Sequence, residues 1–216
     1  MRNGSLAILI NKRYFCEKIR IMTAVVAQEQ ERMTIEEYLE LEERSQTKHE
    51  YVKGQITPMP GGTLKHNIIA SNIVTALNIA IRQLSKSFIV SNSDTKIWIP
   101  VIETFYYPDA VVICEVPAFY KGRKDVVLNP LLIVAVSSSS TEAHDRGTKV
   151  FDYAALPSLQ EYLIIRHDYP MAHLSNRTET DDWRLRSVEH LDQSIELLSI
   201  GCSISMHDVY DKTENL

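Results

Sequence analysis

The chain has little of what marks several large classes of protein. Its 216 residues include three cysteines, which lie far apart and form no C-x-x-C pair: Cys16, Cys114 and Cys202. A disulfide framework and a zinc site are therefore not expected, and a reducing cytoplasm fits this composition. No apolar run approaches the roughly 20 residues of a membrane span, so we expect no membrane partner.

Several catalytic and nucleotide-binding motifs are also missing. The sequence has no G-x-x-x-x-G-K-[ST] and no G-x-G-x-x-G, so a nucleotide cofactor has no support. Its histidines show no H-E-x-x-H spacing, and the serine run 137–140 lacks a G-x-S-x-G elbow. We interpret those serines as a turn and a helix cap. The net charge of −5 argues against coating nucleic acid by bulk attraction, but it does not exclude a local basic groove.

What remains is an ordinary globular composition, with 44% hydrophobic and 24% charged residues. The length predicts a single domain, which we place at residues 33–210. Basic residues surround a short apolar run near the start, without a cleavage site, which argues against a secretory signal. We expect residues 1–32 to be a disordered extension, with Met22 as a candidate start, and residues 211–216 to be a tail.

Helix signals and apolar runs alternate along this domain. Thr34 and Glu37 form a capping box, which predicts a helix to about Arg44. Residues 64–84 carry apolar side chains at three- and four-residue steps and predict a long helix with one buried face. We expect further strands at the following ranges: 49–59 (two strands around a glycine turn), 88–90, 96–100, 160–165 and several short runs within 171–210.

Two continuous apolar runs, 110–114 and 131–136, predict central strands covered on both faces. Ser139 and Glu142 form a second capping-box pattern, which predicts a helix to about residue 156. The order of elements predicts a mixed α/β domain in which helices flank a central mixed sheet.

The candidate chemistry centres on one acid and one lysine. Asp109 follows Pro108 at the mouth of the first central strand, where sites tend to form in α/β sheets. The alternative is that Asp109 is a turn residue. Lys149 lies four residues after Asp145 on the predicted helix, so the two share a face. Lys149 either points toward Asp109 or forms a solvated ion pair with Asp145.

Two further residues have open interpretations. Glu50 stands before the first strand, as either a surface residue or a further acid of the same site. His66 lies early in the long helix, and we favour a capping or packing role for it over a role as a ligand.

These residues resemble a restriction-endonuclease-like family abundant in cyanobacteria, long described as a domain of unknown function. The resemblance covers nearly 180 residues in matching order. It rests on the segments MTIEEYLELEE, HEYVKGQI, YYPDAVVIC, NPLLIVAVSSSSTEAHDRGTKVFDYAALPSLQEYLII and LLSIGCSISMHDVY. The family has the PD-(D/E)XK fold, so the resemblance implies a restriction endonuclease-like α/β fold. It also implies cleavage of DNA with Mg²⁺ or Mn²⁺, and a homodimer by analogy with enzymes that cut both strands.

The resemblance also assigns the site. Asp109 matches the metal-binding aspartate, Lys149 the catalytic lysine and Glu50 an acidic position of the family. The main-chain carbonyl of Val136 is a further expected metal ligand. The second metal-binding glutamate of the family is Ala135 here, which offers no oxygen ligand.

This departure predicts a weakened endonuclease, because a lost ligand removes part of the metal's electrostatic effect. Glu142, Asp145 and Glu115 are candidate substitutes for the lost acid. The alternative is a catalytically inactive member that binds DNA or another protein.

Overall fold

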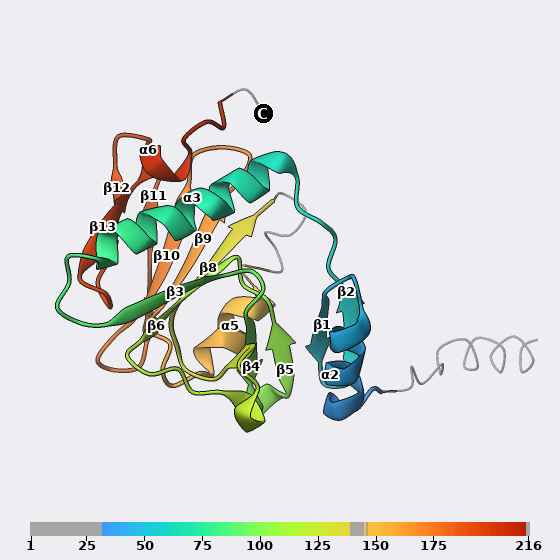
Figure 1. Cartoon of the computed structure of the whole chain (residues 1–216). Helices are drawn as coiled ribbons and strands as arrows, with labels where there is room; N and C mark the ends of the chain where they lie inside the picture. Colours follow the sequence, from blue (N-terminus) through green and yellow to red (C-terminus); the bar gives the residue numbers. More distant parts are fainter. Residues whose placement is uncertain (1–31, 139–144, 146, 215–216) are drawn as a thin grey trace, which may run out of the picture.

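The computed structural model describes residues 32–138, 145 and 147–214, in two larger sheets, a strand pair and helices packed against them (Figure 1). The helices are α2 Ile35–Arg44, α3 Leu64–Ile81, α5 Thr148–Ala154 and α6 Met206–Val209. The strands of the six-stranded sheet, in spatial order, are β11 Trp183–Val188, β10 Ala172–Arg177, β9 Glu161–Arg166, β8 Pro130–Ser137, β6 Ala110–Cys114 and β3 Phe88–Asn92. The strands of the five-stranded sheet are β2 Gln55–Pro58, β1 His49–Val52, β5 Thr104–Tyr106, β4 Lys96–Ile99 and β7 Val126–Val127, and the pair is β12 Ser194–Leu197 with β13 Cys202–Ser205.

Strand β8 lies inside the six-stranded sheet and is buried on both faces. It runs antiparallel to β6 and parallel to β9, the strand that follows α5 along the chain. Val134 and Val136 face one apolar core, while Ile133 and Ala135 face another. The continuous apolar run of the sequence is therefore confirmed as a strand covered on both sides.

Helix α3 covers one face of this sheet (Figure 1). Ile69, Ile73 and Leu77 are fully buried against it, as the three- and four-residue spacing predicts. The Thr63 side chain caps the helix by accepting a hydrogen bond from the backbone N–H of His66 at 3.2 Å. The cap places His66 in the first turn of α3.

The smaller sheet packs with α2 around an aromatic cluster that includes Tyr38, Tyr51 and Phe105. The predicted capping box is confirmed. Thr34 Oγ1 accepts from the N–H of Glu37 at 3.2 Å, and the Glu37 carboxylate accepts from the N–H of Thr34 at 2.8 Å. Within the smaller sheet, β1 pairs antiparallel with β5.

The mixed α/β prediction is confirmed, with some differences in detail. Strands β5 and β7 have three and two residues, too few for the sequence pattern to reveal, and the second sheet was not expected. Helix α5 begins at Thr148 with Gly147 as its N-cap. The predicted extension 1–32, except for its last residue, and the predicted cap of Ser139 and Glu142 lie outside the described residues. Within the described part of the chain, no helix is long and apolar enough to cross a membrane.

Candidate active site

Asp109 lies at the N-terminal end of β6, an inner strand of the six-stranded sheet. Its backbone N–H donates to the carbonyl of Val134 at 2.9 Å, and its Oδ2 accepts from the N–H of Val136 at 2.7 Å. The residue therefore continues the pairing of β6 with β8. Asp109 lies in a bend directly before β6, as its interpretation as a turn residue expects, and both its backbone and its side chain are also bound to β8.

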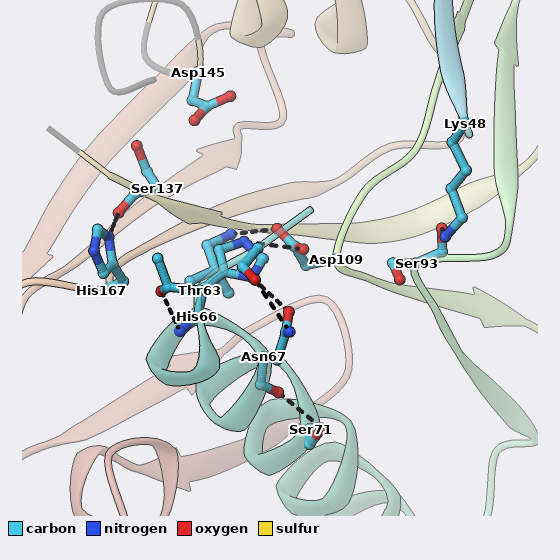
Figure 2. A network of polar contacts seen from close by, with 12 residues as sticks. Lys48, Thr63, His66, Asn67, Ser71, Ser93, Asp109, Ser137, Asp145 and His167 are labelled. Atoms are coloured by element: carbon cyan, nitrogen blue, oxygen red, sulfur yellow. Dashed lines mark hydrogen bonds and ion pairs between the residues drawn. The ribbon is translucent and has the colours of Figure 1, made fainter. Parts of the chain in front are cut away.

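His66 lies against this carboxylate. Its Nε2 is 3.4 Å from Asp109 Oδ1, and its ring lies beside Asp109 in Figure 2. The backbone of His66 joins the helix cap, while its ring points at Asp109, and the choice between a packing role and a ligand role for the ring stays a prediction. The sequence could not show this contact, because it depends on how α3 crosses the strands.

The charge of Asp109 is costly in this position. Burial raises the pKa of Asp109 above its ordinary value, and the nearby charge of Asp145 adds to the rise. Three neighbours lower the pKa in turn: His66 and Lys149 act electrostatically, and the N–H of Val136 acts through its hydrogen bond. Burial therefore makes this carboxyl harder to ionise than a solvated aspartate.

Lys149 lies in an ion cluster that joins α5 to the smaller sheet. Its Nζ is 2.7 Å from Glu50 Oε1 and 3.6 Å from Asp145 Oδ1, and it stands 5.1 Å from the centre of the Tyr106 ring. The side chains of Lys149, Glu50 and Asp145 are 15%, 13% and 8% exposed. The predicted pairing with Asp145 is observed, but the pair is buried and has gained Glu50.

Glu50 lies inside β1, not before the first strand as expected, and it is not a surface residue. Its Oε1 accepts from Lys149 Nζ. The expected role of Glu50 beside Asp109 as a metal ligand stays a prediction, and so does that of the Val136 carbonyl.

Tyr106 was not recognised from the sequence as part of this site. Its hydroxyl donates to Asp152 Oδ2 at 2.7 Å, and burial is the main reason that its pKa is raised. The bond ties β5 to α5 three residues beyond Lys149. Tyr106 therefore holds the lysine at the sheet edge, both through its ring and through its hydroxyl.

Ala135 stands on the same strand, next to the residue that binds Asp109. Its methyl group packs on the face of β8 that also carries Ile133. Among the candidate substitutes, Asp145 lies within the ion cluster, and Glu142 lies outside the described residues. Glu115 follows the other end of β6, about 20 Å away at 3.3–3.4 Å per residue, so it cannot replace the lost acid.

The donors around Asp109 form an incomplete set of metal ligands. In the part of the chain that the structure describes, no three His, Cys, Asp or Glu side chains are grouped closely enough to hold a metal by themselves. Asp109 Oδ1 and His66 Nε2 nevertheless offer two donors 3.4 Å apart. They fit an ion whose other ligands are water or substrate.

A cavity of about 460 Å³ lies at the start of α3, beside this pair. It is lined by Thr63, Leu64, Lys65, His167 and Asp168. His167 follows β9, and its Nδ1 lies 3.3 Å from the carbonyl oxygen of Ser137 (Figure 2). The cavity provides space for a ligand next to the residue that contacts Asp109.

Known proteins resemble the chain both in sequence and in fold. The family model described as "Uma2: Putative restriction endonuclease" matches residues 35–207. The uncharacterized protein slr1290 of Synechocystis sp. PCC 6803 is 36% identical over 180 residues, which are 83% of this chain and 92% of that one. A second protein of that organism, sll1609, is 37% identical over 133 residues, which are 62% of this chain and 74% of its own.

A solved structure shares the fold. It is the crystal structure of a putative nuclease belonging to DUF820 from Anabaena variabilis, with a TM-score of 0.68 and 16% sequence identity. The match covers 84% of this chain and 99% of the other. This likeness confirms the expected nuclease-type α/β architecture.

Proposed function

We propose that this chain, which belongs to the Uma2 family of putative restriction endonucleases, is a weakened metal-dependent DNA endonuclease. The observation that supports this proposal most directly is that Asp109, which is bound to β8, lies within electrostatic range of the buried cluster of Lys149, Glu50 and Asp145. The ammonium is close enough to oppose the rise in the pKa of Asp109.

The reaction adds one water to a phosphodiester. The water oxygen bonds to phosphorus, the bond from phosphorus to the leaving sugar oxygen breaks, and a hydroxyl and a phosphate monoester result. Asp109 and His66 are the residues that would hold a divalent ion, which supplies polarisation of the phosphate and a more acidic water. Lys149 supplies a positive charge for the attacking water or the phosphate oxygens.

The surrounding residues fix the positions of the Lys149 ammonium and the Asp109 carboxylate. Glu50 and Asp145 contact Lys149 from two sides, and Tyr106 covers it with a ring. The N–H of Val136 holds one oxygen of Asp109, which leaves the other oxygen directed at His66. The chain therefore has a positioned carboxylate and a positioned ammonium, and Ala135 leaves it short of one ligand.

Cleavage assays with Mg²⁺ and with Mn²⁺, on single- and double-stranded DNA, test the proposal. We expect slow, metal-dependent cleavage that Asp109→Asn and Lys149→Ala abolish. Cleavage that survives both substitutions would come from a contaminant or another site and would refute the proposal.

The second candidate is a non-catalytic DNA- or protein-binding member, and Ala135 is the observation that favours it. In that case no metal supports cleavage by the wild-type chain, and DNA binding is insensitive to metal and to Asp109→Ala. The salt dependence of binding would show whether phosphate contacts carry the affinity.

A further inference from the structure

We propose that His66 and Asp109 form a two-residue site for a first-row divalent transition-metal ion, and that His66 makes this ion preferred over Mg²⁺. The inference deepens the proposed function, because it assigns the type of metal at the same site. It concerns binding of the metal itself and is tested without DNA.

The distance between the two donors is the first observation. Asp109 Oδ1 and His66 Nε2 lie 3.4 Å apart. Two ligands about 2.1 Å from one ion are separated by about 3.0 Å in octahedral geometry and by about 3.4 Å in tetrahedral geometry. The spacing suits a shared ion at least as well as a shared proton.

The tautomer of His66 is the second observation. The amide nitrogen of Asn67 donates to the carbonyl of Gly62 at 3.3 Å, so Asn67 Oδ1 faces the ring, 3.3 Å from Nδ1 of His66. Only a protonated Nδ1 can donate to this oxygen, and in the neutral ring this leaves the lone pair on Nε2. Such a bond on the far nitrogen is how metal-binding histidines are usually oriented.

Gly62 makes room for this arrangement. A Cβ at position 62 would lie 2.6 Å from both His66 Nδ1 and Asn67 Oδ1. The close approach of the ring to the amide therefore depends on the missing side chain.

The carboxylate completes the site. Oδ2 of Asp109 is held by Val136, which leaves Oδ1 facing the lone pair of Nε2. When the imidazole is neutral, these two acceptors repel each other unless a cation lies between them. A divalent ion meets this need without requiring the imidazole to be protonated.

The donor types select the metal. Mg²⁺ prefers oxygen ligands, whereas imidazole nitrogen suits transition metals. Ala135 removes one oxygen from the expected set, so nitrogen makes up a larger share of what remains. The remaining positions would be filled by water or by a phosphate oxygen, and the residues that precede His66, Thr63 to Lys65, line a cavity at the start of α3.

Metal binding by the full chain tests the inference. Mn²⁺ is titrated and followed by its electron paramagnetic resonance signal, and Co²⁺ is followed by its visible absorption, which reports nitrogen ligation. We expect His66→Gln to weaken Mn²⁺ and Co²⁺ binding by about tenfold or more, the scale seen when the support of a metal site is lost. Mg²⁺ binding should change by less than about twofold, because Mg²⁺ relies on carboxylate and water.

His190→Gln is the matched control, because His190 is exposed and lies in the loop between β11 and β12. It should bind both metals like the wild type. Equal Mn²⁺ affinity in wild type and His66→Gln, or no Mn²⁺ binding by the wild type, would overturn the inference.

A measurement on the unaltered chain covers the case in which His66→Gln does not fold. In protein labelled with ¹⁵N-histidine, Zn²⁺ should shift Nε2 of His66 while Nδ1 stays protonated, and an unshifted Nε2 would contradict the site. Failure here remains distinct from failure of the endonuclease proposal. Metal binding without DNA cleavage leaves the site standing, and Mg²⁺-dependent cleavage that His66→Gln does not change leaves the endonuclease standing.

Discussion

Replacing Lys149 by methionine removes the positive charge of a buried ion cluster while keeping a side chain of similar length. The ammonium lies 2.7 Å from a Glu50 oxygen and 3.6 Å from an Asp145 oxygen. With an effective dielectric constant of about 20, Coulomb's law gives gross attractions of about 6 and about 5 kcal/mol for these two contacts. Relief of the desolvation of the lysine offsets much of this sum, and breaking a buried pair costs about 3–5 kcal/mol net.

We therefore expect the free energy of unfolding of Lys149→Met to fall by about 3–5 kcal/mol at pH 7. For a domain of this size each kcal/mol shifts the melting temperature by about 2–4 °C, so the midpoint should fall by roughly 6–20 °C. Urea unfolding followed by circular dichroism measures the free energy, and a thermal scan measures the midpoint. Acidification should reduce the deficit, because it neutralises the stranded carboxylates.

Two further variants show whether the cluster is the cause. Lys121 pairs with Glu36 at 2.9 Å, but both side chains are well exposed, so Lys121→Met should cause no measurable loss. Adding Glu50→Gln to Lys149→Met removes one stranded charge and should recover part of the stability. If Lys149→Met unfolds at the same urea concentration as the wild type, the ion cluster does not stabilise the fold as argued.

Three other substitutions have clear expectations. Ala135→Glu restores the missing carboxylate, and we expect metal-dependent cleavage to rise by about 100-fold or more, equivalent to about 3 kcal/mol of transition-state stabilisation, in a DNA cleavage assay. Burial raises the pKa of Asp109 in the folded chain above the ordinary 3.8. The contribution of Asp109 to the free energy of unfolding is therefore fully present below pH 3.8 and is lost as the pH rises through the folded-state pKa. In metal-free buffer, Asp109→Asn should therefore gain stability relative to the wild type between acidic and neutral pH, as urea midpoints will show, although it abolishes cleavage. Thr34→Ala breaks the capping box with Glu37 and should cost about 1 kcal/mol in urea unfolding, with cleavage at saturating metal unchanged.

Local signals in the sequence predicted the parts of the fold that local physics determines. Helix α3 was expected at residues 64–84 and spans Leu64–Ile81, because its buried stripe repeats every three or four residues. Strands β6 and β8 followed from their continuous apolar runs, and the box of Thr34 and Glu37 marked the start of α2. Each of these signals lies within a few residues along the chain.

The contacts that build the site span longer stretches of chain, and the sequence did not predict most of them. His66 and Asp109 are 43 positions apart, and Glu50 and Lys149 are 99 positions apart. Their meeting depends on the angle at which α3 crosses β8 and on the place of β1 beside β5. The sequence left Glu50 as either a surface residue or a further acid of the site, and the family resemblance favoured the second, but neither suggested the ion pair with Lys149.

Ala135 offers no oxygen ligand, but the acids around Asp109 remain. Asp109, Glu50 and Asp145 carry three negative charges when ionised, and Lys149 returns one positive charge, so these four groups sum to −2. A glutamate in place of Ala135 would make the sum −3. This net negative charge favours the approach of a divalent ion. What Ala135 lacks is an oxygen placed to bind that ion, so the substitution should reduce the rate of cleavage more than it reduces the binding of metal.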